Sequence, residues 1–296
     1  MGWFSTNYAL LLNGVAMGLL LFMMAVGLTV IFGMLDILNL AHGAFFMVGA
    51  YLGYRIAGEA TATWGSFALA LVTCIAVGAV IGVAFMLMTR PLVARGHMDQ
   101  ALLTLGLALV VSQLLLVVFG KDDHAVAAPG RLSQSVSLFG SAYPAYRLAV
   151  IVLGLVVAAG VWLILEKTSA GAIVRATVSD RPMVEACGID VRTVMTATFA
   201  GASALAVVAG LLAGPIQGAS SGIGDNTLLL ALVVIVIGGL GSVAGTLLGA
   251  MIIGLMQSVG VMVAPELASF LTFGAMVLVL AFRPQGLIPA RVPVSR

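Results

Sequence analysis

The stretch Tyr8–Phe32 reads YALLLNGVAMGLLLFMMAVGLTVIF and decides the class of fold. It contains no charged side chain, and an α-helix needs roughly 20 apolar residues to cross the hydrocarbon core of a bilayer. The run is too long for the apolar region of a cleaved signal peptide, and Met1–Asn7 before it carries no positive charge. We therefore expect a retained membrane-spanning helix.

The composition of the whole chain supports the same conclusion. Of the 296 residues, 62% are hydrophobic and only 8% are charged, and the mean hydropathy is +1.20. Too few polar side chains remain to cover a soluble domain, and a net charge of +2 argues against nucleic-acid binding. Cys74 and Cys187 fall in an apolar segment and a charged loop, so neither a disulfide nor a metal site is expected.

Further apolar segments follow along the chain. The expected spans are Tyr8–Phe32, Leu40–Ile56, Gly65–Met88, Ala101–Phe119, Tyr146–Leu165, Val194–Gly214, Leu228–Ile237, Thr246–Val263 and Leu267–Phe282. Gly238–Ser242 either breaks one helix or separates two, so the count lies between eight and ten, with nine preferred. The predicted fold is an all-α, polytopic integral membrane protein in which residues 1–296 form a single transmembrane domain.

Positive charge sets the orientation of such a chain, because Lys and Arg accumulate in cytoplasmic loops. With nine spans and an outer N-terminus, nine of the 13 Lys and Arg residues lie on the cytoplasmic side. They are Arg90, Arg95, Lys167, Arg175, Arg181, Arg192, Arg283, Arg291 and Arg296. The C-terminus is therefore predicted to be cytoplasmic, whereas a tenth span would reverse the N-terminus.

The motifs of common enzymes are missing from this sequence. It has no Gly-x-x-x-x-Gly-Lys-Ser/Thr phosphate loop, no His-Glu-x-x-His and no Gly-x-Ser-x-Gly. Charges deep within the spans are almost absent, although ion-driven carriers usually place acidic residues there. We expect no catalytic residue, metal or bound cofactor, and a transport energy that comes from a partner.

A polar interruption, Asp36, Asn39, His42 and Gly43, lies between the first two apolar runs. In one interpretation Asp36 and Asn39 cap the start of the second span, and His42 bonds a neighbouring backbone carbonyl. In the other, the stretch is a helix break that lines a transport pathway, where half-helix ends hold a charged solute. The two interpretations are compatible.

The longest predicted cytoplasmic loop, Glu166–Thr193, contains a short helix. Pro182 suits its first turn and Gly188 its end, which predicts a helix over Pro182–Cys187. The alternatives are a solvated surface turn and a docking helix for a cytoplasmic motor subunit.

Glycines repeat at four-residue spacing in the second half of the chain. Gly210, Gly214 and Gly218 form one series, and Gly241, Gly245 and Gly249 form another. This spacing is typical of faces where helix backbones approach closely. Gly238, Gly239 and Gly241 also suggest a helix break, a second-half counterpart of Asp36–Gly43 and a candidate part of the pathway.

Three motifs resemble one family. They are Leu38–Gly43 followed by Gly49-Ala50-Tyr51, the loop from Gly171 through Arg175-Ala176 to Ala186-x-Gly188-Ile189, and Val236–Gly245. Together they resemble the H-type permease subunit of the LIV branched-chain amino-acid ABC importers, across nearly the whole chain. Urea and short-amide permeases share the Asn-x-Ala-His-Gly pattern, and Ala44 stands where an acidic residue is frequent.

The resemblance implies an ABC importer permease in the bacterial inner membrane. Its partners would be a homologous second permease, two cytoplasmic ATP-binding cassette subunits that use ATP and Mg²⁺, and an external substrate-binding protein. Pro182–Ile189, with Glu185, Ala186 and Gly188, would be the ATPase coupling segment, and Arg175 and Glu185 would flank the ATPase groove. Competing classes are an independent channel or secondary carrier and a purely structural scaffold.

Overall fold

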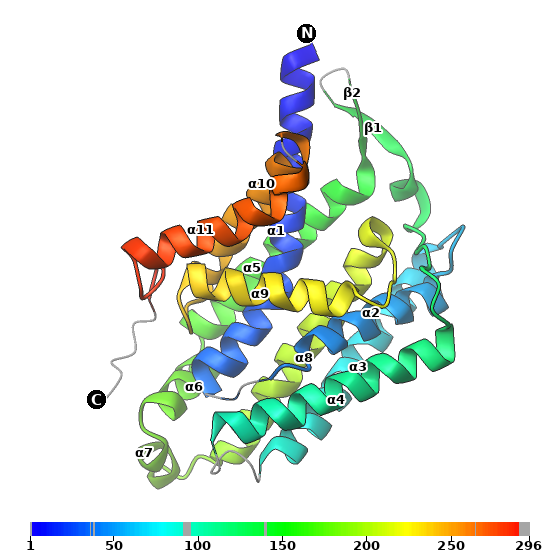
Figure 1. Ribbon diagram of the computed structural model, residues 1–296. Helices are drawn as coiled ribbons and strands as arrows, with labels where there is room; N and C mark the ends of the chain where they lie inside the picture. Colours follow the sequence, from blue (N-terminus) through cyan, green and yellow to red (C-terminus); the bar gives the residue numbers. More distant parts are fainter. Residues whose placement is uncertain are drawn as a thin grey trace.

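The computed structural model describes residues 2–35, 37, 39–90, 96–138, 141–263 and 265–289 (Figure 1). Its long helices are α1 (Gly2–Leu35), α2 (His42–Ala57), α3 (Trp64–Thr89), α4 (His97–Phe119), α5 (Ala145–Lys167), α8 (Val191–Gln217), α9 (Ile223–Gly238), α10 (Val243–Val263) and α11 (Ala268–Phe282). Shorter elements are α6 (Ser169–Ser179), α7 (Arg181–Ala186), the 3₁₀ turns η2 (Gly130–Ser133) and η3 (Pro265–Leu267), and the strands β1 (Ser135–Leu138) and β2 (Ser141–Pro144).

The predicted all-α membrane fold is confirmed. Within the described residues, nine helices overlap the nine expected spans, and six of them are long and apolar enough to cross a membrane. The other three, α2, α9 and α11, have 16, 16 and 15 residues. The two segments on either side of Gly238 are separate helices, α9 and α10, and not one broken helix.

Two helices form the centre of the bundle. In the most apolar stretches of α1 and α8, 83% and 67% of the residues are buried inside the protein, against 6% in α4. An apolar helix that is buried on all sides belongs to the interior of a bundle, whereas α4 presents most of its surface outward. The other helices are therefore arranged around α1 and α8.

The helices pack as two halves with opposite directions. Helix α1 packs against α10, and α8 packs against α3. Helix α1 also contacts α8, and α2 contacts α9, so the first and second parts of the chain meet at these helices. In Figure 1, α1 runs down from the side of the β1–β2 hairpin, and α8 runs up from the side of α6 and α7. Opposite directions of α1 and α8 are what an inverted-topology repeat predicts, an arrangement that many transporters use.

Glycines allow the helices to cross at the centre. A Cβ atom at Gly49 on α2 would overlap the Val207 carbonyl of α8, and one at Gly210 would overlap the Phe46 carbonyl. Gly245 and Gly249 approach α9 equally closely. The predicted packing role of the four-residue glycine series is therefore confirmed for these members.

The ends of the helices define two sides of the molecule. Helices α6 and α7 lie on the side that the positive charges assign to the cytoplasm, which we call the inner side (Figure 1). The β1–β2 hairpin lies on the opposite, outer side; its strands pair antiparallel, with Val136 opposite Tyr143.

Replacing Gly49 with Ala should destabilise the protein by about 1–3 kcal/mol, because the new methyl group forces α2 away from α8. The matched control is Gly106→Ala in α4, where an added Cβ meets nothing within 4 Å. The midpoint of thermal unfolding in detergent should fall for the Gly49 variant and stay unchanged for the control. Equal midpoints for both variants would contradict this account of the helix crossing.

Candidate functional site

The interruption before α2 is a tight turn. The Asn39 side chain is buried and its Oδ1 accepts from the Ala41 amide at 3.0 Å. The residue that caps α2 is Ala41, without a side-chain bond, so Asn39 satisfies an amide ahead of the helix and is not the predicted N-cap. Asp36 lies outside the described residues. The Nδ2 atom of Asn39 has no hydrogen-bond partner among the described residues.

His42 is fully buried at the start of α2. Its Nε2 lies 3.2 Å from the Met24 carbonyl oxygen of α1, which confirms the predicted bond to a backbone carbonyl. Because a carbonyl only accepts, Nε2 must carry the proton. The ring is packed so closely on α1 that a Cβ at Gly27 would lie 2.9 Å from Nε2. His42 therefore joins α2 to α1.

Gly43 makes the contact between the two halves. A Cβ at Gly43 would lie 2.5 Å from the Gly224 carbonyl oxygen of α9, and one at Gly224 would lie 2.6 Å from the Gly43 carbonyl oxygen. The end of α1 also lies close to the Gly238 segment, because a Cβ at Gly33 would lie 2.5 Å from the Gly241 Cα. The pairing of Asp36–Gly43 with the Gly238 segment as paired helix breaks of a pathway stays a prediction.

The Gly238–Ser242 segment is a packed turn between α9 and α10. Gly239 and Gly241 have φ values of 105° and 77°, which only glycine adopts easily. The amides of Leu287 and Ile288 donate to the carbonyls of Ile237 and Gly238 at 2.8 and 3.0 Å. Gly238, Gly239 and Gly241 therefore hold the C-terminal segment at the interruption between α9 and α10, and their predicted part in a pathway stays a prediction.

Helix α7 confirms the predicted short helix to within one residue. Asp180 caps it, with Oδ1 accepting from the Met183 amide at 3.0 Å, and Pro182 lies in its first turn. Ala186 is its last residue, and Gly188 beyond it has a φ of 80°. The Ile189 amide bonds back to the Val184 carbonyl at 3.4 Å, so the segment forms a closed loop.

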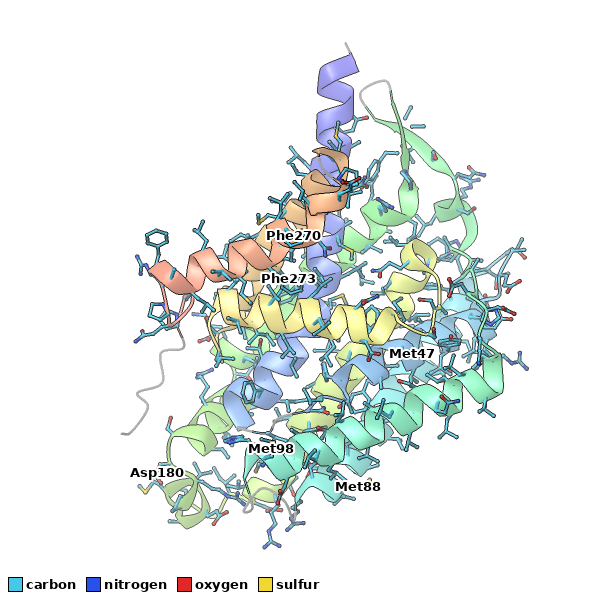
Figure 2. All side chains as sticks on the ribbon, in the orientation of Figure 1. Met47, Met88, Met98, Asp180, Phe270 and Phe273 are labelled. Atoms are coloured by element: carbon cyan, nitrogen blue, oxygen red, sulfur yellow. The ribbon has the colours of Figure 1, made fainter. Side chains whose placement is uncertain are left out.

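Arg175 and Glu185 do not pair with each other. Arg175 Nη1 lies 4.0 Å from Glu166 Oε2, and Glu185 Oε1 lies 3.2 Å from Arg181 Nε. On α7, Val184 is buried against the bundle, while the neighbouring Met183 is 60% exposed. Figure 2 shows Asp180 of this segment at the inner extremity of the molecule. An apolar side chain presented between ion pairs suits contact with another protein.

The start of α8 lies beside this segment. Asp190 caps α8 by accepting from the Thr193 hydroxyl at 2.6 Å and from the Arg192 amide at 3.0 Å. The hydroxyl bond is the main reason why the pKa of Asp190 is lowered. An open hollow of about 440 Å³, lined also by Arg90 and Thr196, follows this helix start.

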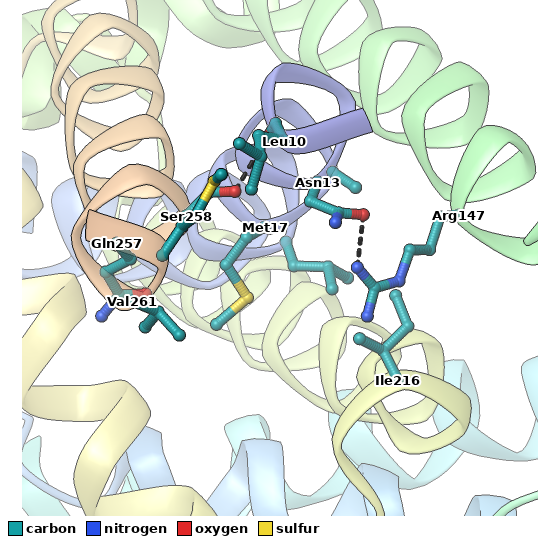
Figure 3. A pocket seen from close by; sticks show the side chains of 11 residues that line it. Leu10, Asn13, Met17, Arg147, Ile216, Gln257, Ser258 and Val261 are labelled. Atoms are coloured by element: carbon teal, nitrogen blue, oxygen red, sulfur yellow. Dashed lines mark hydrogen bonds between the residues drawn. The ribbon is translucent and has the colours of Figure 1, made fainter. Parts of the chain in front are cut away.

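A second cavity, of about 320 Å³, lies on the outer side between α1, α5, α10 and the end of α8 (Figure 3). Asn13 and Arg147 bond to each other at its edge. Neither Asn39 nor His42 lines this cavity or the inner hollow. Among the described residues, no group of three or more His, Cys, Asp or Glu side chains is placed to hold a metal ion.

Comparison with known proteins decides between the classes of membrane protein. Residues 10–280 match the family described as the branched-chain amino acid transport system permease component. The chain belongs to this permease family. The match runs from α1 to α11 and includes the α6–α7 segment.

Several permeases of this family are similar over nearly their full length. The high-affinity branched-chain amino acid transport system permease protein BraD of Pseudomonas aeruginosa is 27% identical, over 94% of each chain. The corresponding permease protein LivH of Escherichia coli is 24% identical, over 93% of each. A probable branched-chain amino acid transport permease of Methanocaldococcus jannaschii is 28% identical, over 81% of this chain and 76% of its own. No solved structure gives a significant match.

The sequence analysis of this permease missed the outer cavity. Asn13 and Arg147 are far apart in sequence, and each looks like a polar residue near the end of an apolar span. Their contact depends on the relative depth and rotation of α1 and α5, which no local sequence pattern predicts.

His42→Ala should lower the stability of this permease by about 2–4 kcal/mol, because it leaves a cavity and removes the bond to the Met24 carbonyl. His42→Asn, which keeps a side-chain donor, is the matched comparison and should lose less. The measurement is the unfolding midpoint in detergent together with the amount of protein in the membrane. Normal stability with impaired uptake in the alanine variant would instead place His42 in the pathway.

Proposed function

We propose that this chain is the membrane-spanning permease subunit of an ATP-binding-cassette importer that moves branched-chain, aliphatic amino acids across the bacterial inner membrane. The observation that carries this proposal is the family match over residues 10–280. The names of the similar proteins from Pseudomonas and Escherichia support the substrate class. The chain itself performs no hydrolysis in this proposal.

The energy comes from two cytoplasmic ATP-binding cassette subunits that dock on α7. Met183 enters an apolar pocket of the ATPase, and the Arg181–Glu185 and Arg175–Glu166 pairs lie around it. Val184, buried beneath Met183, transmits a push on α7 to the bundle. A homologous second permease completes the pore, and an external binding protein delivers the solute.

The inverted repeat supplies the moving parts. Helix α8 begins at Val191, just after α7, and crosses α2 at the glycine contacts of Gly49 and Gly210. A shift of α7 therefore displaces α8, and α8 carries α9 and the outer loop with it. Rocking of one half against the other exposes the solute first to the outer side and then to the inner side.

Met183→Asp should weaken docking of the ATPase subunits by about 2 kcal/mol, roughly thirtyfold, because it places a charge in an apolar contact. Met98→Asp is the matched control: Met98 is 74% exposed at the start of α4, away from α7. Co-purification of the ATPase and stimulated ATP hydrolysis should fall only for the Met183 variant. Equal behaviour of the two variants would remove α7 from the docking surface.

The substrate class is tested by competition. Proteoliposomes with the complete importer should take up labelled leucine when ATP is supplied on the side of the membrane that carries the ATPase subunits. Isoleucine and valine should compete with leucine for this uptake. Urea and acetamide at the same concentration should not. Competition by urea or acetamide alone would favour a urea or short-amide importer, and uptake by this chain without ATPase subunits would favour an independent carrier or channel.

A further inference from the structure

The outer cavity combines an apolar wall with a polar edge. Seven of its eleven lining residues are apolar, among them Leu10, Met17, Leu20 and Val261, and the four polar ones are Asn13, Arg147, Gln257 and Ser258. Figure 3 shows the Arg147 guanidinium directed at the Asn13 amide, with Met17 beside them.

Hydrogen-bond donors dominate the polar edge. Asn13 Oδ1 accepts from the Tyr143 hydroxyl at 3.0 Å and from the Arg147 guanidinium. Because both partners donate, the amide oxygen must face them, and the amide NH₂ remains for a ligand. The guanidinium keeps further N–H groups free. No acidic side chain of the described residues lines the cavity or forms an ion pair with Arg147, so the site suits an anion.

The donors lie at the depth of lipid headgroups. The apolar stretch Tyr8–Gly33 has 26 residues and is about 39 Å long, roughly 9 Å more than the hydrocarbon core. Asn13 is close to the outer end of this stretch, and Arg147 is in the first turn of α5. Both therefore lie near the boundary between headgroups and hydrocarbon. From there, Met17 and Leu20 continue the apolar wall inward along α1.

Two helix seams beside the cavity are closed against a passing solute. On the α1–α10 seam, a Cβ at Gly254 would lie 2.5 Å from the Gly18 Cα. On the α1–α5 seam, a Cβ at Gly154 would lie 2.7 Å from the Leu19 Cβ. An amino acid would also need an acidic partner for its ammonium group, and the lining has none. The occupant should therefore be an amphipathic anion that enters sideways from the membrane.

We propose that this cavity is a binding site for a phospholipid of the outer leaflet, with a preference for anionic lipids. Arg147, Asn13 and Gln257 hold the phosphate, and one acyl chain follows Met17 and Leu20. The exposed Val261 and Met262 mark the edge of the site that faces the lipid. This proposal goes beyond the transport function and does not depend on the identity of the solute.

The test uses the full importer in nanodiscs with spin-labelled phosphatidylglycerol or phosphatidylcholine. One arginine near the membrane surface contributes about 1 kcal/mol to binding an anionic lipid, which is about a fivefold preference. We expect phosphatidylglycerol to be immobilised about fivefold more strongly than phosphatidylcholine. Arg147→Gln should abolish this preference, whereas Arg131→Gln should keep it, because Arg131 is an exposed outer residue in η2 that does not line the cavity.

Three results would overturn the proposal: equal immobilisation of both lipids by the unaltered protein, the same loss in the Arg131 variant, or displacement of the lipid by leucine. The last result would assign the cavity to the solute. If Arg147→Gln does not yield folded protein, Gln257→Leu replaces it and should lower the preference without removing the guanidinium; an unchanged preference there would also count against the site.

Discussion

Backbone contact at glycines is the constraint on which the whole structure depends. Lipid gives apolar helices no hydrophobic reason to associate, so close packing must hold them together. In this permease α2 lies against α8 at Gly49 and Gly210, and against α9 at Gly43 and Gly224, with no room for even a methyl group. These contacts fix α2 against α8 and α9, while His42 joins α2 to α1. Because these contacts leave no free space, a small shift of α8 must also move the helices packed against it.

The inner surface is built on a different principle. Helices α6 and α7 are held by caps and ion pairs, which are solvent-exposed and individually weak. Buried side chains attach this segment to the bundle: Val174 and Thr177 on α6, and Val184 on α7. Met183, beside Val184, faces outward. In the proposed importer this arrangement separates the part that docks from the part that moves.

Local patterns predicted the elements well, because each depends on nearby residues. The apolar runs located the nine span-like helices, and the Pro182 and Gly188 signals located α7 to within one residue. The bond from His42 to a backbone carbonyl was also expected, since a buried imidazole needs a partner. The interruption at Gly238–Gly241 was predicted, but its packing partners were not. A glycine-rich turn and a helix break look alike until their partners, Gly33 and the segment Gln285–Ile288, are known.

The sequence by itself determined that this protein is a helical membrane protein, because it has too few polar residues to cover a surface that faces water. It also determined the family, through motifs carried in one order along the chain. Only the tertiary structure decided that α2 packs against α9, and that Asn13 and Arg147 meet at an outer cavity. Those facts depend on the rotation and depth of helices that are distant in sequence, and side-chain periodicity fixes neither.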